Sequence, residues 1–292
     1  KLQDMAKIKF KSAMKEYYAK AGLPTARYHL VQGLDDALEF AHYVGYPVVV
    51  KPDNGVGANN TFKLCSDDDM RWFISNKNDE VYIMEEYVNG YVQTYDAIVD
   101  SKGAPLFESG NVTPLSLMDI VNEGGDSIYY LVKDLPERIR DAGLRTVKAF
   151  GVKSRFIHLE FFILNEDQEG LGKKGDILGL EVNMRPAGGY TPEMYNYSQE
   201  TDVYKIWADM VCFDTNTKPI GNHHYCAFYS RRDGRHYKLD DYEITLKYKD
   251  KLKMWGRIPD ALSGAMANQM YVCNFDTEEE MNQFYQDMAA TY

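Results

Sequence analysis

Two segments, Arg155-Phe-Ile-His-Leu-Glu-Phe-Phe162 and Leu180-Glu-Val-Asn-Met-Arg185, carry the strongest pattern in this 292-residue sequence. Each alternates polar or charged residues with apolar ones, as a strand does when one face is buried and the other carries polar groups. A polar, glycine-containing stretch separates them. The pattern predicts two strands, at 155–164 and 177–184, that can pair with each other.

The alternation assigns the polar side chains of both segments to one face. The apolar residues Leu180, Val182 and Met184 then point to the opposite, core-facing side. If the two strands pair, two carboxylates, an amide, an imidazole and a guanidinium converge on one surface. These side chains belong to His158, Glu160, Glu181, Asn183 and Arg185.

This surface is a candidate metal site. Carboxylates brought close together repel each other, and a hard divalent cation with oxygen ligands relieves that repulsion. Glu160, Glu181 and Asn183 supply such oxygens, and Arg185 can bind a phosphate or carboxylate beside the cation. A solvated face of an antiparallel hairpin alternates equally well. From this segment alone, both interpretations remain open.

Lys51 ends the short apolar run Tyr46-Pro-Val-Val-Val-Lys51 and precedes a loop that contains Gly55 and Gly57. A lysine in this position can meet phosphates, and a glycine-rich loop lets backbone N–H groups close over them. The loop lacks the Gly-Lys-Ser/Thr ending of a P-loop. An ordinary turn with a surface lysine has the same composition, so the motif alone does not decide.

The segment Ile83-Met-Glu-Glu-Tyr-Val-Asn-Gly90 runs from an apolar strand into acidic and aromatic residues. Such a segment can hold a purine, with apolar side chains over its faces and backbone groups along its edge. A simple crossover between two lobes has the same appearance. This segment alone also leaves both interpretations open.

The order of predicted elements indicates an α/β (α+β) protein with two lobes and a tail. We expect an N-terminal lobe at 1–88, a second lobe at 89–212 and an accessory α/β tail at 213–292. Within them, Gly and Pro positions, helical spacing and alternation predict the elements. Helices are expected at 4–21, 36–45, 66–76, 135–150, 201–212 and 276–288, a hairpin at 93–111, and a mobile loop at 112–134.

The amino-acid composition disfavours several classes of function. The formal net charge of −11 disfavours binding to nucleic acid or anionic membranes. No apolar run reaches the roughly 18 to 20 residues that span a bilayer. The four cysteines are scattered singly, without zinc-site spacing, and we expect them reduced in a cytoplasmic protein.

Taken together, the segments at 51–57, 83–90 and 155–185 resemble the ATP-grasp superfamily in order and spacing, over about residues 4 to 212. The opening helix is similar to those of carbamoyl phosphate synthetase and biotin carboxylase, with Lys7 seven positions before Met14. The resemblance implies ATP held between two lobes, an antiparallel sheet in the larger lobe, and Mg²⁺, with Mn²⁺ as a possible substitute.

The resemblance also implies roles for individual residues. Catalysis would rest on Arg185 and Lys51, and the metal on Glu160, Glu181 and Asn183. Lys7 and Lys51 would hold the ATP phosphates. Glu85 would accept from the exocyclic amine of adenine, and the backbones of Glu86 and Val88 would complete that edge. Gln93 stands where the family usually has a glutamate that binds the ribose hydroxyls, and an amide can still hydrogen-bond a diol without charge assistance. The nucleotide-binding set is Lys7, Lys51, Gly55, Gly57, Glu85, Glu86, Val88, Gln93 and His158.

The run Glu181-Val-Asn-Met-Arg-Pro-Ala-Gly-Gly189 looks most like a branch of carboxylate-amine ligases. The resemblance implies that ATP activates a carboxylate as an acyl phosphate, which an amine then attacks. A bicarbonate-using carboxylase or carbamoyl-phosphate-type enzyme, and a nucleotide-binding module without catalysis, are the alternatives. Members of that branch carry a further α/β domain before this start, so we expect a fragment of a longer chain. A homodimer is possible.

Overall fold

The computed structural model describes residues 5–55, 60–114 and 125–292. Packing divides the chain into two compact units that are each discontinuous in sequence. Unit 1 contains Lys1–Tyr91, Asp141–Val152 and Leu159–Asn183, and unit 2 contains Val92–Arg140, Lys153–His158 and Met184–Tyr292. The three-part division expected from the sequence stays a prediction.

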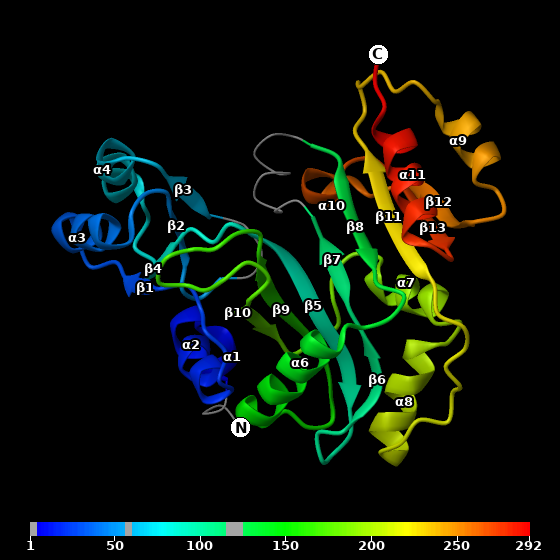
Figure 1. The fold of residues 1–292 in the computed structure, drawn as a ribbon, viewed down its shortest axis with the longest axis horizontal. Coiled ribbons are helices and arrows are strands. Elements are labelled where there is room, and N and C mark those ends of the chain that lie inside the picture. The colour runs from blue at the N-terminus through cyan, green and yellow to red at the C-terminus, as the bar shows by residue number, and fades with distance from the viewer. Residues whose placement is uncertain (1–4, 56–59, 115–124) are drawn as a thin grey trace. The chain divides into compact units, whose positions relative to one another are not determined.

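The chain mixes helices with strands, and Figure 1 labels both in chain order. The described helices are α1 (Ala6–Lys9), α2 (Lys11–Lys20), α3 (Leu34–Val44), α4 (Asp67–Asn76), α6 (Glu137–Phe150), α7 (Thr191–Ser198), α8 (Val203–Phe213), α9 (Asp241–Lys247), α10 (Asp260–Met266) and α11 (Glu278–Ala289). The described strands are β1 (Tyr28–Leu30), β2 (Val48–Pro52), β3 (Phe62–Leu64), β4 (Tyr82–Glu86), β5 (Gly90–Val99), β6 (Pro105–Ser109), β7 (Asn111–Thr113), β8 (Ser127–Leu131), β9 (Arg155–Leu164), β10 (Ile177–Asn183), β11 (Tyr225–Arg231), β12 (Leu252–Arg257) and β13 (Gln269–Phe275).

Unit 1 contains a four-stranded antiparallel sheet in the order β1-β4-β2-β3. Alternation gives its two faces different roles. Val48, Val50 and Met84 are fully buried against α3 and α4, which lie beside this sheet in Figure 1. The opposite face carries Lys51 and Glu85. The unit also contains β10 and the end of β9, which neighbour each other.

The helix ends of unit 1 confirm some predicted signals and contradict one. The side chain of Ser66 caps α4 by accepting from the backbone N–H of Asp69, and Gly45 ends α3 with a φ of 84°. Asp36 and Glu39, three residues apart, resemble a capping box in the sequence, but the structure has none there. Helix α3 begins after Gly33 without a side-chain cap, because the Asp36 carboxylate instead accepts from the backbone N–H of Gln32.

The single helix predicted at 4–21 is interrupted. Phe10 is extended, with φ −98° and ψ 125°, and separates α1 from α2. The prediction was wrong here because the interruption depends on a distant residue. The backbone carbonyl of Asp53 accepts from Lys11 N, and its carboxylate accepts from the backbone N–H and hydroxyl of Ser12 at 2.7 and 2.8 Å.

Unit 2 has the strand order β5-β7-β8-β11-β13-β12, with β6 also paired to β5. The hairpin predicted at 93–111 is confirmed by the antiparallel pairing of β5 and β6. The tail strand β11 pairs with β8 as well as β13, so the tail continues this sheet. Besides the helix expected at 276–288, the tail contains the short helices α9 and α10.

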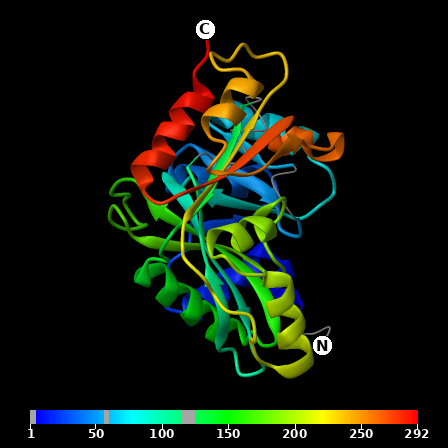
Figure 2. The same ribbon diagram turned by 90° about the vertical axis from the view of Figure 1, so that its right-hand side faces the viewer.

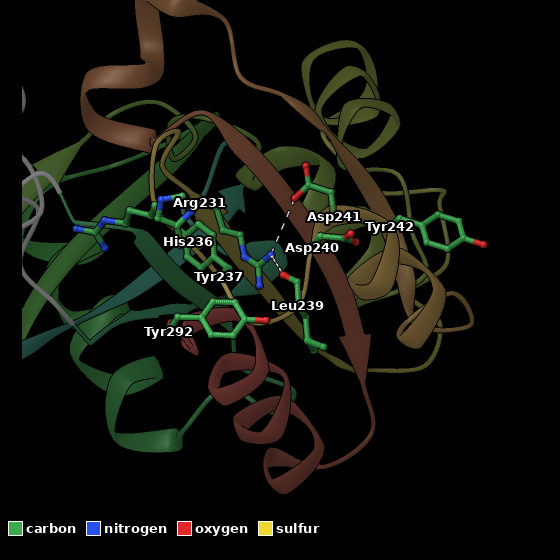
Figure 3. Close-up of a pocket in the computed structure, with 9 residues that line it drawn as sticks. Arg231, His236, Tyr237, Leu239, Asp240, Asp241, Tyr242 and Tyr292 are labelled. Atoms are coloured by element: carbon green, nitrogen blue, oxygen red, sulfur yellow. Dashed lines mark hydrogen bonds and ion pairs between the residues drawn. The ribbon is translucent and has the colours of Figure 1, made fainter.

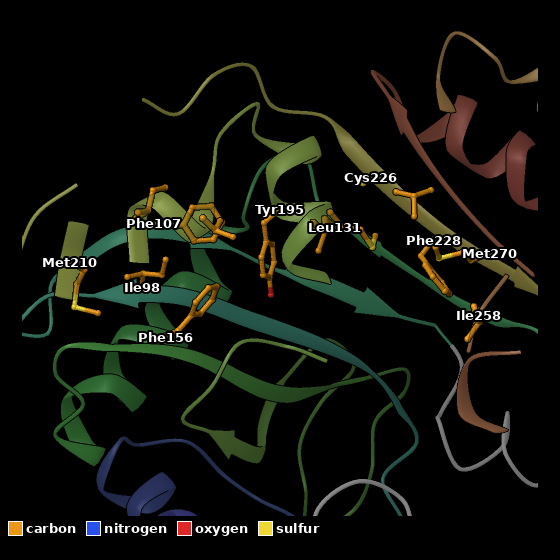
Figure 4. Close-up of a cluster of buried hydrophobic side chains, with 14 residues drawn as sticks. Ile98, Phe107, Leu131, Phe156, Tyr195, Met210, Cys226, Phe228, Ile258 and Met270 are labelled. Carbon is orange, nitrogen blue, oxygen red and sulfur yellow. The ribbon is translucent and has the colours of Figure 1, made fainter. Parts of the chain in front are cut away.

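Alternation along β11 and β13 gives unit 2 two apolar clusters. Phe228 and Val272 point into the cluster drawn in Figure 4, which includes Tyr195 of α7. Tyr229 and Tyr271 point into the other cluster, which is built with residues of α11. Figure 2 shows α11 lying along these strands. The helix predicted at 276–288 is therefore confirmed, with its apolar residues packed on the sheet.

Two predictions between the strands were incomplete. The loop expected at 112–134 contains the end of β7 and all of β8, while residues 115–124 lie outside the described residues. Helix α7, which Pro192 introduces in its first turn, was not predicted. Among the helices of the described ranges, none combines the length and apolar character required to cross a bilayer.

Candidate functional site

The site in unit 1 is built around α2, whose first turn is fixed by Asp53. A carboxylate that accepts from N–H groups at the start of a helix satisfies donors that lack intrahelical partners. Because α2 starts at Lys11, the side chains of Lys11 and Lys15 lie one turn apart on the same side. Both side chains are buried, with 7% and 6% of their surface exposed.

Lys11 connects α2 to β10 and to the glycine loop. Its Nζ atom donates to the carbonyl of Gly55 at 2.6 Å and lies 3.6 Å from Oε1 of Glu181. Glu181 therefore faces α2 rather than the apolar side of β10. Gly57 lies outside the described residues. A lysine buried between a loop carbonyl and a carboxylate is a cation prepared to meet an anionic group.

Lys15 and Lys51 share the carboxylate of Glu85. Lys51 Nζ lies 2.5 Å from Oε2 of Glu85, and Lys15 pairs with Oε1. The register of β2 and β4 sets Glu85 opposite Val49, two residues from Lys51, so the two side chains are diagonal neighbours. Burial alone would raise the pKa of Glu85, but the two ammonium groups outweigh it and lower the pKa to about 2.

The same surroundings disfavour the charged form of Lys15, whereas they favour the charged form of Glu85. Burial lowers the pKa of Lys15, the Glu85 carboxylate partly offsets this, and the nearby Lys51 lowers it further. The cluster therefore keeps one buried carboxylate ionised between two cations. An anion that offers Lys51 a second partner would relieve the repulsion between the lysines.

The strand pair β9 and β10 brings together the predicted metal ligands. Asn183 donates its Nδ2 to Oε1 of Glu160 at 3.2 Å. Glu160, Glu181 and Asn183 therefore offer two carboxylates and an amide oxygen on neighbouring strands of unit 1. Within the described ranges no group of three His, Cys, Asp or Glu residues can hold a metal by itself. The oxygen donor set fits Mg²⁺, which usually keeps water or phosphate oxygens as its remaining ligands.

Tyr18 holds α2 against these strands. Its ring fits over Gly179 of β10, where an added Cβ would lie only 2.4 Å from the ring carbons. Its hydroxyl donates to the backbone carbonyl of Glu160 at 3.4 Å. Burial raises the pKa of Tyr18 well above its ordinary value, and the nearby carboxylates of Glu160 and Glu181 add to this. The lysine-bearing helix is thus packed directly on the strands that carry the carboxylates.

Three other predicted site residues of unit 1 have their own partners. Lys7 donates its Nζ to the carbonyl of Phe150 at 2.6 Å, at the end of α6. The Glu86 carboxylate accepts from Arg27, with Nε at 2.7 Å. Val88 is buried in a small apolar cluster. These contacts leave the backbone roles of Glu86 and Val88, and the role of Lys7, as predictions.

The remaining predicted residues belong to unit 2. His158 Nδ1 lies 2.6 Å from Oδ1 of the buried Asp96. Gln93 is buried on β5, and Arg185, which is exposed, donates to the carbonyl of Pro186 at 2.9 Å. Their proposed roles toward a nucleotide stay predictions.

Sequence reasoning missed Lys11, Lys15 and Asp53. The signal was present in Lys11-Ser-Ala-Met-Lys15, where two lysines stand four residues apart on a helix. Recognising it required the helix to start at Lys11. That start depends on Asp53, which lies more than forty residues away along the chain.

The tail carries a basic group, Arg231, Arg232, Arg235 and His236. Surface charge of this kind predicts a solvated strand end, and for Arg231 that prediction is wrong. Arg231 is buried and donates to the carbonyls of Leu239 and Met288, at 2.7 and 3.0 Å. Arg231 lines a pocket together with His236 and Tyr292, which Figure 3 draws as sticks. Its guanidinium holds the end of α11, because the carbonyls there lack helical partners.

The fold of the chain is that of ATP-grasp proteins. An L-amino acid ligase from Bacillus licheniformis is 16% identical and has a TM-score of 0.69, covering 98% of this chain and 71% of the ligase chain. The biotin carboxylase domain of Hydrogenobacter thermophilus 2-oxoglutarate carboxylase, solved with MgADP and bicarbonate, is 13% identical with a TM-score of 0.67. That match covers 96% of this chain and 65% of that domain.

Residues 6–168 match the family described as "Carbamoyl-phosphate synthase L chain, ATP binding domain". The match covers more than half of the sequence, and the chain belongs to this family. A carbamoyl phosphate synthase large chain of Thermotoga petrophila is 28% identical over 198 residues, which are 63% of this chain. The mitochondrial ammonia-dependent enzyme of Mus musculus is 23% identical over 178 residues, or 56% of this chain.

The chain is much shorter than these relatives. It spans 17% of the Thermotoga large chain and 11% of the mouse enzyme. The comparisons therefore confirm the predicted superfamily and fold. They leave the activity, the substrates and the partners of the whole protein to be proposed.

Proposed function

We propose that this chain binds Mg-ATP and is the ATP-using part of a carboxylate-amine ligase. The observation that carries the proposal is the arrangement in unit 1 of the buried Lys11 and Lys15 and the partly buried Lys51 with carboxylates on β4 and β10. Membership of an ATP-binding domain family supports the nucleotide. The ATP-grasp fold, shared with an amino acid ligase, supports the reaction class.

Lys11 and Lys51 are the proposed phosphate ligands. Lys11 is buried and Lys51 is partly buried. Lys11 pairs with Glu181 and Lys51 with Glu85, and a phosphate can replace either carboxylate as the partner of the lysine. Lys7, predicted for this role from the sequence, donates instead to a helix-end carbonyl. We therefore favour Lys11 over Lys7 as the cation from the opening helix.

Glu160, Glu181 and Asn183 would hold Mg²⁺ through oxygen atoms. When bound, the metal supplies charge neutralisation for the β- and γ-phosphate oxygens. Mn²⁺, whose ligand preferences are similar, would occupy the same oxygens. Lys11 lies within reach of Glu181 and so would neutralise charge beside the metal.

The proposed reaction begins with attack of a substrate carboxylate oxygen on the γ-phosphorus of ATP. The γ-phosphorus–oxygen bond to ADP breaks, and an acyl phosphate forms. An amine then attacks the acyl carbon, an amide bond forms and phosphate leaves. Arg185 is proposed to stabilise charge on the transferred group. Glu85 is proposed to accept from the exocyclic amine of adenine, and the backbones of Glu86 and Val88 to complete that edge.

The test is ADP release by the full-length protein with magnesium, across panels of carboxylates and amines. We expect release only when a specific acid is present, and amide product when its amine is added. Glu181→Ala should abolish release while leaving the circular dichroism spectrum unchanged. Glu39→Ala, which removes an exposed carboxylate of α3, serves as the matched control. Wild-type rates in Glu181→Ala would remove the metal assignment.

Two outcomes distinguish the alternatives. ADP release that depends on bicarbonate alone would favour a carboxylase or carbamoyl-phosphate-type enzyme. ATP binding that is independent of magnesium, without ADP release under any condition, would favour a non-catalytic module. A homodimer and a cytoplasmic location stay predictions, and the first is checked by sedimentation of the full-length protein.

A further inference from the structure

Glu85 is shared by two lysines that come from different elements. Lys51 of β2 pairs with Oε2, and Lys15 of α2 pairs with Oε1. The carboxylate and the Lys15 side chain are both nearly inaccessible, at 5% and 6% exposure. The centroid of the Tyr28 ring on β1 lies 5.7 Å from Lys15 Nζ. Each oxygen of one buried carboxylate therefore has its own ammonium group.

The neighbouring Glu86 forms its own ion pair with Arg27. Its carboxylate accepts from both the backbone N–H and the side chain of Arg27. Lys11, the next cation along α2, faces Glu181. In this cluster Glu85 is the carboxylate for Lys15 and Lys51 together.

When ATP binds, Lys15 and Lys51 are expected to have different partners, and this inference rests on the proposed function. Lys51 is proposed to turn to the phosphates. Glu85 would then stay buried with Lys15 as the cation that keeps it ionised. An ionised carboxylate only accepts hydrogen bonds, whereas a protonated carboxyl group also donates one.

We propose that Lys15 determines nucleobase specificity by holding Glu85 as a pure acceptor when Lys51 engages the triphosphate. A pure acceptor pairs with the 6-amino group of adenine and repels the 6-oxo group of hypoxanthine or guanine. Without Lys15 the buried Glu85 would take up a proton and donate to a 6-oxo group. Lys15 acts through Glu85 and is thus a positioning residue.

The experiment compares the affinities for ATP and inosine triphosphate, both with magnesium, by calorimetry on the same preparation of full-length protein. Because the ratio of the two dissociation constants is insensitive to the folded fraction, partial unfolding does not disturb it. We expect Lys15→Met to reduce the preference for ATP at least tenfold. Lys15→Arg should keep it within about threefold, as a charge-assisted partner remains. Lys20→Met on the same helix, at an exposed position, should leave it unchanged.

A second variant, Glu85→Gln, tests whether Lys15 acts through Glu85. In Glu85→Gln the amide can accept or donate, so the preference should already be low, and adding Lys15→Met should lower it no further. Retention of the wild-type preference by Lys15→Met, or an equal affinity of wild type for both nucleotides, would overturn the inference while leaving ATP binding in place. Failure of wild type to bind either nucleotide would instead remove the proposed function.

Discussion

The Nζ atom of Lys11 lies 3.6 Å from Oε1 of Glu181 and joins the start of α2 to β10. This pair sets a proposed phosphate-binding cation beside a proposed metal-binding carboxylate before either ligand is present. Each side chain is then held in place by the other. When Mg²⁺ and a triphosphate bind, Glu181 would contact the metal and Lys11 would contact the phosphates. Two ionic contacts would then replace the Lys11–Glu181 pair.

The first prediction compares the two lysines of the opening helices. Lys11→Met should raise the dissociation constant of Mg-ATP about thirtyfold, because it removes a buried charge-assisted contact of roughly 2 kcal/mol. Lys7→Met should change it less than threefold, since Lys7 donates to the carbonyl of Phe150. Calorimetric titration measures both. The reverse order of effects would restore Lys7 as the phosphate ligand.

The second prediction concerns acid. The folded-state pKa of Glu85 is about 2, below its ordinary value of 4.5. The stability that this depression contributes is fully present above about pH 4.5 and is lost as pH falls toward 2. Glu85→Gln leaves the buried Lys15 and the partly buried Lys51 without their carboxylate and should cost about 3 kcal/mol at pH 7.

The measurement for Glu85 is urea unfolding between pH 7 and pH 2.5. The difference in unfolding free energy between wild type and Glu85→Gln should shrink as the pH falls below 4.5. Glu39→Gln, at an exposed position of α3, should show a small difference at every pH. A gap between wild type and Glu85→Gln that stays constant with pH would contradict the low pKa.

The sequence predicts strands and helix ends correctly where the signal lies in neighbouring residues. Alternation located β9 and β10, and it correctly assigned Glu160 and Asn183 to neighbouring positions. Ser66 and Gly45 mark the start of α4 and the end of α3, because capping depends on residues within one turn. These predictions needed no knowledge of the rest of the fold.

The sequence does not predict a structural feature that depends on a residue far away along the chain. Phe10 has no helix-breaking chemistry of its own, and the break there follows from hydrogen bonds to Asp53. That break moves the helix start to Lys11 and brings Lys11 and Lys15 into the site. Arg231 likewise looked like a surface charge until its partners, the carbonyls at the end of α11, were known.

The third prediction tests Asp53 as the residue that starts α2. Asp53→Ala removes acceptors from two donors of Ser12 and should destabilise the protein by about 1 to 2 kcal/mol. Asp53→Asn keeps one carbonyl oxygen for the backbone N–H and should cost less. Since α2 carries Lys11, the Ala variant should also weaken Mg-ATP binding. Unfolding curves and calorimetry check the two effects, and an Ala variant with wild-type stability would refute the capping role.

The last prediction concerns the packing of α2 on β10. In Gly179→Ala the new Cβ would lie 2.4 Å from ring carbons of Tyr18, and that ring is fully buried. Either the ring or the strand must shift, so we expect a loss of about 1 to 3 kcal/mol in unfolding free energy. Gly264→Ala is the matched control, because nothing lies within 4 Å of its added Cβ.

A double variant shows whether the cost of Gly179→Ala comes from this contact. Tyr18→Leu alone should destabilise by loss of buried ring surface, but adding Gly179→Ala to it should cost less than in wild type, because the clash is gone. Chemical unfolding of the four proteins gives the interaction energy. Strictly additive effects would mean that α2 does not rest on Gly179. Non-additive ones would tie the position of the lysine-bearing helix to a single residue of the carboxylate-bearing strand.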